Sequence, residues 1–295
     1  MSFCAEFIRL SSTVAVIALP FRRPTVTDAS EGRGQVGGRC LPWRFEEVVR
    51  RREWFIVNGT PTIVLVHGAF ADSSGFNAVA KRLVADGYPV VAAPNPLRGL
   101  AFDASHVKAL LDSIEGPIVL VGHSYGGAVI SAAAEGNTNV KALVYLAAFV
   151  PETGESAQAL VERFPGSTVG ESLKPVPLPD GQVDLYIDPK VFHPHFAADV
   201  SLEEATLYSI TQRPATGAAL GEPATGPQAW HTIPSYNLIS GADRIIPPPT
   251  QEFMALRSGA KTQVVEGASH MVFVSRPGAT VALIETAVQE QTTPQ

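Results

Sequence analysis

Short apolar runs alternate with amphipathic segments from Thr62 to about residue 150. Residues 63–66 and 118–121 are continuous aliphatic runs, which are typical of strands buried on both faces of a parallel sheet. Between such runs, apolar residues recur at helical spacing. This alternation predicts a mostly parallel sheet that is flanked by helices. The expected strands are residues 63–66, 89–93, 118–121 and 142–148, and the expected helices are residues 76–84, 102–114 and 124–135.

The alternation fails between residues 151 and 230, where Pro and Gly are scattered and helical patches such as residues 202–210 stand alone. No buried-strand pattern is visible there, so we interpret residues 151–230 as a cap, or lid, inserted over the sheet. The alternation then resumes with strands at 236–239 and 263–265, a helix near 250–256 and a last helix begun by Pro277. The predicted core therefore comprises residues 59–150 and 231–295.

Residues 1–58 differ from the rest of the chain and are predicted to be an N-terminal extension of unknown role, with both cysteines, Cys4 and Cys40, inside it. Whether these cysteines pair stays open. The apolar run at residues 14–19 is too short to cross a bilayer, so no membrane span is expected. The same run resembles a degenerate secretion signal, but Glu6 stands in the would-be basic segment. We expect a cytoplasmic protein, with secretion as the open alternative.

The charge pattern argues against nucleic acid as a partner. The formal net charge is −6, and only 17% of the residues are charged. The longest basic run is Arg50 to Arg52, so no continuous positive track is available for a phosphate backbone. A small molecule is the expected partner, and the sequence leaves the oligomeric state unknown.

The strongest chemical signal is the sequence Gly122-His-Ser124-Tyr-Gly126, which follows a buried strand and opens an Ala-rich helix. This Gly-x-Ser-x-Gly pattern between a strand and a helix is typical of a nucleophile elbow. The two glycines leave room for a sharp turn that lifts the serine hydroxyl above the sheet edge, next to the helix N-terminus. Ser124 is therefore the predicted nucleophile.

The loop after the first strand, His67-Gly-Ala69-Phe, is predicted to hold a developing oxyanion. The expected donors are the backbone N–H groups of Ala69 and Tyr125, whose side chains only shape the pocket. His67 itself is expected to bond to the backbone, because the base of this arrangement comes late in the chain.

When a serine stands in an elbow of this kind, an acidic residue and then a histidine follow it along the chain. Asp243 comes directly after an apolar strand in a Gly- and Pro-rich loop, and His270 follows the last short strand. We predict that His270 is the general base and that Asp243 orients it. Glu152, just past the strand at 142–148, is the alternative acid. His193 and His195 suggest a metal, but two ligands without Cys or an acidic neighbour favour an ordinary cap loop, so no metal is expected.

With these motifs, the sequence from about Thr62 to Val288 resembles bacterial α/β-hydrolase-fold serine hydrolases related to the plant methylesterases and hydroxynitrile lyases. The resemblance implies the α/β-hydrolase fold, with a small cap inserted after its sixth strand and no cofactor. It also implies hydrolysis of a carboxylic ester by a serine esterase with a catalytic triad. A neutral, small-to-medium ester fits best, since acidic residues outnumber basic ones in the cap. Candidate substrate contacts are Phe70, Phe149, Phe192 and Trp230.

Other chemistries of this fold stay open. Hydroxynitrile lyases of the group carry a threonine after the oxyanion-loop histidine and a lysine after the catalytic histidine, whereas Gly68 and Met271 stand here. That difference favours ester hydrolysis over cyanohydrin cleavage. Perhydrolase, amidase and lactonase chemistry are further options, and a small-molecule binder or receptor with little turnover is the alternative from another class.

Overall fold

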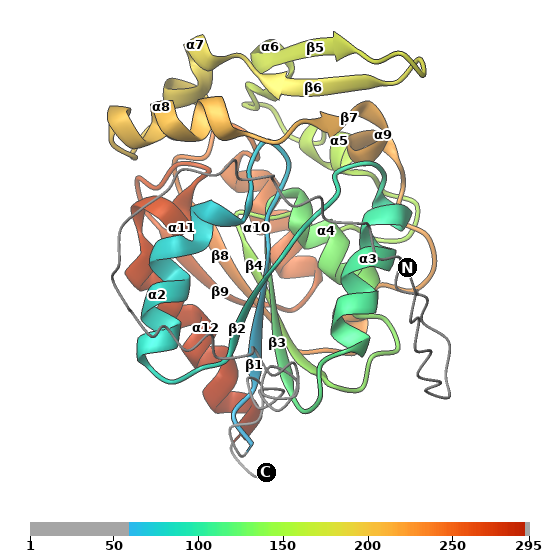
Figure 1. The fold of residues 1–295 in the computed structure, drawn as a ribbon, viewed down its shortest axis with the longest axis vertical. Coiled ribbons are helices and arrows are strands. Elements are labelled where there is room, and N and C mark those ends of the chain that lie inside the picture. The colour runs from blue at the N-terminus through green and yellow to red at the C-terminus, as the bar shows by residue number, and fades with distance from the viewer. Residues whose placement is uncertain (1–58, 293–295) are drawn as a thin grey trace, which may run out of the picture. The chain divides into compact units, whose positions relative to one another are not determined.

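The computed structural model describes residues 59–292, so the predictions for residues 1–58, including those for Cys4 and Cys40, lie outside the described residues. The first of its two sheets has six strands, all parallel (Figure 1). In spatial order these strands are β2 (Val90–Ala93), β1 (Thr62–Val66), β3 (Ile118–His123), β4 (Val140–Leu146), β8 (Ser235–Ser240) and β9 (Lys261–Val265). Every residue of β1, β3 and β8 is buried, and for β1 and β3 the continuous aliphatic runs predicted this.

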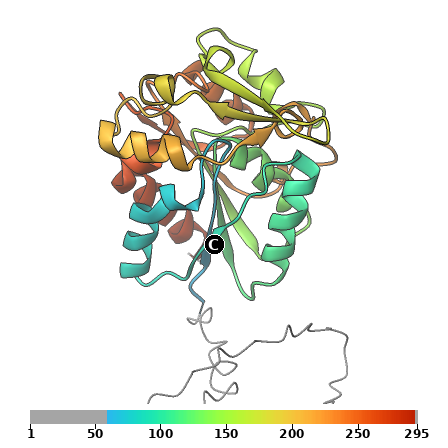
Figure 2. The same cartoon turned by 45° about the horizontal axis from the view of Figure 1, so that its top comes forward.

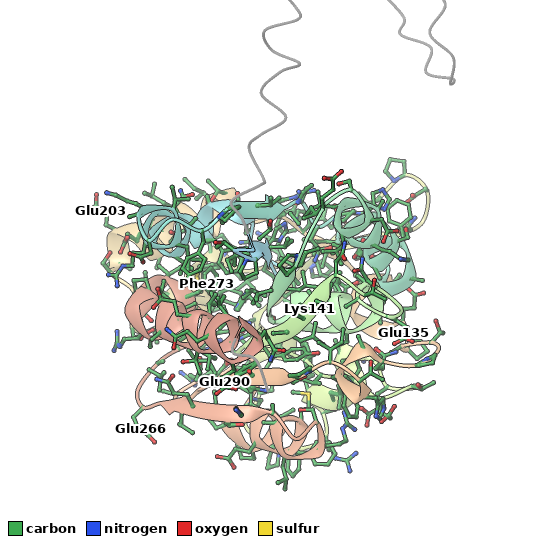
Figure 3. The ribbon with its side chains drawn as sticks, turned by 90° about the horizontal axis from the view of Figure 1, so that it is seen from below. Glu135, Lys141, Glu203, Glu266, Phe273 and Glu290 are labelled. Atoms are coloured by element: carbon green, nitrogen blue, oxygen red, sulfur yellow. The ribbon has the colours of Figure 1, made fainter. Side chains whose placement is uncertain are left out.

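Helices cover both faces of this sheet. On one face α2 and α12 pack together, and on the other α3 and α4 pack together (Figures 1 and 3). Phe273 lies on the side of α2 and α12, and its ring packs against that of Phe76 with centroids 4.6 Å apart, whereas Glu266 lies at the periphery (Figure 3). The helices of the core are α2 (Asn77–Ala85), α3 (Leu100–Asp112), α4 (Tyr125–Ala133), α10 (Pro248–Arg257), α11 (Val272–Ser275) and α12 (Pro277–Thr292), with a 3-10 turn η2 (Ser73–Phe76) before α2. The predicted α/β-hydrolase fold is thus confirmed.

Element ends differ from the sequence expectation where the backbone takes a left-handed conformation. The strand expected to reach residue 148 is β4 and ends at Leu146, because Ala147 has a φ of 43°. The helix expected from residue 124 begins at Tyr125, because Ser124 has a φ of 54°. Both deviations fall at the carboxyl edge of the sheet, where strands turn into the loops that carry the candidate chemistry.

The insertion leaves the sheet after β4, the fourth strand of the described residues, and lies over the carboxyl ends of the parallel strands (Figures 1 and 2). It contains a three-stranded antiparallel sheet in the order β5-β6-β7, which the sequence analysis did not predict. Its elements are α5 (Ala157–Val161), α6 (Val169–Ser172), β5 (Leu173–Pro177), β6 (Val183–Ile187), α7 (Pro189–Val191), a π-helical turn η3 (Phe192–Phe196), α8 (Leu202–Thr211), β7 (Ala215–Thr216), α9 (Gly217–Gly221) and a 3-10 turn η4 (Ala229–His231).

Candidate active site

Ser124 stands on a strained turn between β3 and α4. Its φ of 54° and ψ of −125° lie where L-residues rarely occur. A Cβ on Gly122 would come within 2.7 Å of the Gly126 carbonyl oxygen, and a Cβ on Gly126 within 2.5 Å of the Val66 carbonyl oxygen. Only glycine fits at either position, so the strained turn expected from the Gly-x-Ser-x-Gly motif is present. It places Ser124 at the N-terminus of α4.

The loop after β1 passes directly beside this serine. A Cβ on Gly68 would lie 2.6 Å from the Cβ of Ser124, so glycine at this position allows the close approach. Ala69 and Tyr125 line the same cavity as Ser124. Within residues 59–292, neither of their backbone amides donates to another group. Two unused donors therefore flank the serine, as an oxyanion hole requires.

His67 bonds to backbone groups of its own and the neighbouring loop, as its position predicted. Its Nδ1 lies 3.0 Å from the Gly68 carbonyl oxygen, and its Nε2 accepts from the Asn95 amide at 3.2 Å. Burial lowers the pKa of His67, against the raising effect of the bond to Gly68. The ring is therefore neutral, and its two hydrogen bonds hold the loop in place.

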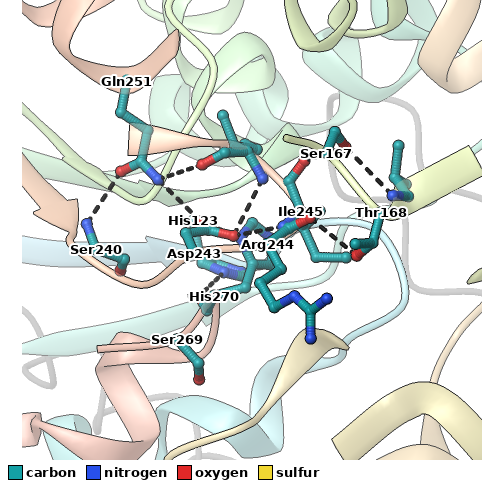
Figure 4. Close-up of polar contacts among 12 residues, drawn as sticks. His123, Ser167, Thr168, Ser240, Asp243, Arg244, Ile245, Gln251, Ser269 and His270 are labelled. Atoms are coloured by element: carbon teal, nitrogen blue, oxygen red, sulfur yellow. Dashed lines mark hydrogen bonds and ion pairs between the residues drawn. The ribbon is translucent and has the colours of Figure 1, made fainter. Parts of the chain in front are cut away.

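Asp243 and His270 form a fully buried hydrogen-bonded pair (Figure 4). The Nδ1 of His270 donates to Oδ2 of Asp243 at 2.7 Å. The other carboxylate oxygen, Oδ1, accepts from the backbone amides of Ile245 at 2.8 Å and Ile246 at 3.1 Å. These donors hold the carboxylate in place. Because the carboxylate accepts the proton on Nδ1 of His270, the favoured tautomer leaves Nε2 free to accept a proton.

Gln251, in the first turns of α10, completes the support of the carboxylate (Figure 4). Its Nε2 donates to Asp243 Oδ2 at 2.9 Å and to the Ile246 carbonyl at 2.7 Å, and its Oε1 accepts from the Ser240 amide at 3.1 Å. Sequence reasoning missed this residue. Its one signal is its position a few residues after the acid in a helix opened by prolines, which is too general to have found it.

The Nε2 atom of His270 is buried and has no hydrogen-bond partner within residues 59–292. Ser124 and His270 are therefore not hydrogen-bonded to one another here, although both lie at the carboxyl edge of the sheet, Ser124 after β3 and His270 after β9. In ligand-free enzymes such bonds are often long and tighten only around a substrate. Beside the pair, the Nε2 of His123 lies 3.0 Å from the His270 carbonyl oxygen and anchors the backbone of the candidate base.

Glu152, the alternative acid, has other partners. Its carboxylate lies 3.0 Å from Nε2 of His231 and accepts from the Thr153 amide at 2.9 Å. The Thr153 N–H, with a smaller contribution from His231, lowers the pKa of Glu152. The side chain is a partly exposed surface group, and the carboxylate bonded to His270 is that of Asp243.

A cavity of about 440 Å³ opens between the sheet and the cap. Phe70 and Phe149, two of the predicted substrate contacts, line it together with Ser124. The others, Phe192 and Trp230, are not among its lining residues. Most of the wall comes instead from cap residues 157–173, which the sequence analysis did not single out. The lining includes Ala157, Gln158, Val161, Glu162, Phe164, Pro165, Gly166, Ser167, Val169, Gly170, Leu173, Leu185, Gly217, Leu220 and Ile245.

Phe192 and Trp230 fill packed regions. Phe192 is buried against Phe196, with ring centroids 4.9 Å apart. Trp230 donates through Nε1 to the Pro151 carbonyl oxygen at 2.8 Å, which fastens one end of the insertion to the other. Aromatic side chains in such places contribute buried area to the core.

His193 and His195 bond to different groups. Nε2 of His193 lies 3.1 Å from the Val200 carbonyl oxygen, whereas Nδ1 of His195 lies 2.8 Å from Oγ of Ser172. Across residues 59–292, no group of three or more His, Cys, Asp or Glu side chains is placed to hold a metal ion.

Cap side chains also hold the loops that carry the acid and the base. The Ser167 hydroxyl donates to the Ile245 carbonyl at 2.7 Å, and the Thr168 hydroxyl to the Arg244 carbonyl at 3.0 Å (Figure 4). Asp199 accepts from the Ser269 amide at 3.0 Å. The cap is thus bonded on both sides of the Asp243 and His270 pair.

Comparison with known sequences agrees with this geometry. The sequence model of the alpha/beta hydrolase family matches residues 63–283, which include the elbow, the acid loop and the base loop. The chain belongs to the alpha/beta hydrolase family. In the part of this family member that the structure describes, no helix is long and apolar enough to cross a membrane.

Two relatives of this alpha/beta hydrolase come from Arabidopsis thaliana. A putative methylesterase 19 is 25% identical over 247 residues, which cover 75% of this chain and 95% of the relative. An alpha-hydroxynitrile lyase is 23% identical over 242 residues, which cover 72% and 92%. Among solved structures, polyneuridine aldehyde esterase superimposes with a TM-score of 0.68 at 19% identity and covers 77% of this chain and 98% of its own. These matches confirm the resemblance to the plant methylesterase and hydroxynitrile lyase group.

Proposed function

We propose that this protein is a serine esterase that hydrolyses a neutral, small-to-medium carboxylic ester. The observation that carries the proposal is the buried Asp243 and His270 pair at the same edge of the sheet as a strained elbow serine. Ser124 lines a cavity with the two residues whose unused amides flank it, Ala69 and Tyr125. Esterases among the similar proteins support the same reaction class.

In the proposed mechanism, Ser124 Oγ attacks the ester carbonyl carbon while His270 Nε2 takes the hydroxyl proton. The carbonyl oxygen becomes an oxyanion that accepts from the amides of Ala69 and Tyr125. The tetrahedral intermediate collapses to an acyl-enzyme, and His270 gives its proton to the departing alkoxide. Water then attacks the acyl group, with His270 again as base, and releases the acid and free Ser124. The scheme uses no cofactor.

The cavity supports a neutral acyl group of modest size. Its lining is mainly apolar and aromatic, and it includes one acidic side chain, Glu162, but no Lys or Arg. A carboxylate in the substrate would lose its hydration there without gaining a cationic partner. The volume of about 440 Å³ falls in the range of small-molecule sites.

Gly68 supports hydrolysis over cyanohydrin cleavage. Where the lyases of the group carry threonine, a side chain on residue 68 would press against the Cβ of Ser124, 2.6 Å away. The loop is thus built for a residue without a side chain at this point, and the space beside the serine is left for an ester carbonyl.

A panel of esters with increasing acyl length tests the proposal, together with matched acyl groups that end in a carboxylate. We expect wild type to prefer neutral acyl groups, and Ser124→Ala to lose on the order of 10⁴-fold or more in kcat with the fold unchanged by circular dichroism. Ester hydrolysis by Ser124→Ala at the wild-type rate would contradict the proposal.

A further inference from the structure

Tyr125, the residue after the predicted nucleophile, has its backbone at the candidate site and its side-chain hydroxyl in a buried hydrogen bond. It begins α4 and lines the cavity, and its side chain is buried in the core. There its hydroxyl donates to Oδ2 of Asp103 at 2.8 Å. Asp103 is fully buried in the first turn of α3, a helix that contributes nothing to the cavity wall.

Asp103 is itself held by the chain just before its helix. The Arg98 amide donates to both carboxylate oxygens of Asp103, at 3.0 and 3.2 Å. The Arg98 guanidinium reaches into the cap, where it pairs with Asp184 of β6 at 2.5 Å and donates to the Pro214 carbonyl at 3.1 Å. A chain of hydrogen bonds therefore runs from the cap through Arg98 and Asp103 to the Tyr125 hydroxyl.

The surroundings of the Tyr125 hydroxyl keep it protonated, so it donates the hydrogen bond to Asp103. Burial, and then the neighbouring charge of Asp103, raise the pKa of Tyr125, so its hydroxyl keeps its proton. Burial raises the pKa of Asp103 as well, and the bonds from Arg98 and Tyr125 act in the opposite direction. A buried carboxylate with several donors is costly to leave unpaired, so this arrangement has little freedom to shift.

We propose that Asp103 is a positioning residue for the reaction, acting through the Tyr125 hydroxyl to fix the backbone amide of Tyr125 against the oxyanion. This inference rests on the proposed esterase function. An oxyanion donor works only if its N–H is held before the charge develops, and displacements of about 1 Å cost on the order of 100-fold in rate. The amide of Tyr125 lies in the first turn of α4 and has no intrahelical acceptor, while the carbonyl of the same peptide group, Ser124 O, accepts from the Gly127 amide at 2.9 Å and the Phe149 amide at 3.1 Å. The bond to Asp103 adds a further constraint, through the side chain of the residue that carries the amide.

The chain offers a matched control for an ordinary buried tyrosine. Tyr145 on β4 is fully buried, and its hydroxyl lies 2.8 Å from Oγ of Ser131 in the same helix α4. That bond contacts α4 about two turns away from the oxyanion amide. Tyr145→Phe therefore removes a buried tyrosine hydroxyl that bonds to the same helix, and it leaves the contact between Tyr125 and Asp103 unchanged.

The experiment compares the kinetic constants of wild type, Tyr125→Phe, Asp103→Asn and Tyr145→Phe for one good ester substrate. We expect Tyr125→Phe to lower kcat about tenfold with KM within about twofold of wild type, because the contact acts in the transition state and not in ground-state binding. Asp103→Asn is expected to lower kcat similarly and to add little in the Tyr125→Phe background, since both changes break one contact. Tyr145→Phe is expected to lose stability but to keep kcat.

Equal kcat values for Tyr125→Phe and Tyr145→Phe would overturn the inference, as would a loss confined to KM. Failure of the esterase proposal has a different signature, namely no ester turnover by wild type. In that event the rate at which a fluorophosphonate labels Ser124 replaces kcat, because its phosphoryl oxygen needs the same donors. Slower labelling of Tyr125→Phe than of Tyr145→Phe would support the positioning role, and equal labelling would refute it.

Discussion

The parallel sheet and the cap differ in what holds them together. Every residue of β1 and β3 is buried among apolar side chains, whereas β5 of the cap is exposed along most of its length. The sheet is stabilised by buried apolar area and by parallel strand pairing. The cap contacts the loops that carry Asp243 and His270 through polar groups, such as those of Thr168 with Arg244 and of Asp199 with Ser269.

The sheet and the cap therefore have different roles in building the site. The sheet brings the ends of distant strands to one edge, which places the elbow, the acid and the base within one site. The cap supplies most of the cavity wall and hydrogen bonds to the loops. We therefore expect substitutions at the carboxyl edge of the sheet to lower kcat or stability strongly, and substitutions in the cap to lower them less.

The largest expected effect comes from Asp243→Asn, which leaves the shape of the side chain but removes its charge. Without a carboxylate, His270 loses the group that fixes its tautomer and stabilises its protonated form, so kcat should fall on the order of 10⁴-fold. Steady-state kinetics measure this. The matched variant Glu152→Gln, at the surface near the base of the cap, should change kcat less than about threefold. A larger loss in Glu152→Gln than in Asp243→Asn would reassign the acid.

A smaller effect, on stability, comes from adding one methyl group at Gly122. The new Cβ would meet the Gly126 backbone at 2.7 Å, and neither backbone can move without distorting the elbow. Such overpacking costs about 1–3 kcal/mol in the free energy of unfolding. The cap control is Gly170→Ala, whose new methyl group meets nothing within 4 Å and lies in a helix, where alanine is favoured. Urea unfolding that shows equal losses for both variants would break the proposed contrast.

The last expected effect is a dependence of stability on pH. Burial lowers the pKa of His67, and burial together with the charge of His270 lowers that of His123 to well below its ordinary value. The unfolded chain then binds more protons than the folded chain below about pH 6.5. Stability is complete above that pH and should fall as pH decreases, by up to about 1.4 kcal/mol per pH unit for each histidine.

Urea unfolding between pH 7 and pH 5 measures this slope. His67→Gln retains an acceptor for the Asn95 amide but cannot titrate, so its slope should be shallower than that of wild type. An unchanged slope would show that His67 does not contribute to the loss of stability at low pH.

The same contrast explains which features could be predicted from the sequence. Strands β1 and β3 appear as continuous apolar runs, and the elbow as two glycines around a serine, because each depends on local backbone and burial constraints. The cap sheet was missed, since Pro175 and Pro177 break the strand pattern and β5 buries none of its residues. Proline on such an edge strand leaves no alternation to detect.

Contacts between residues far apart in the sequence were missed for another reason. Gln251 beneath Asp243, and Asp103 beneath Tyr125, are single polar residues whose partners are defined only once the chain is folded. The predicted substrate contacts show the same limit. Phe70 and Phe149 adjoin core strands and line the cavity, whereas Phe192 and Trp230 pack elsewhere, because the path of the cap decides which aromatics face inward.

Covalent labelling of the intact protein can identify the nucleophile without a known substrate. Wild type is treated with one equivalent of a fluorophosphonate, and the adduct is located by peptide mass spectrometry. We expect one adduct per chain, on Ser124, with none on Ser124→Ala and slower formation on Asp243→Asn, since His270 there is no longer held as a base. An adduct on any residue other than Ser124, or equal labelling of Ser124→Ala, would show that Ser124 is not the nucleophile.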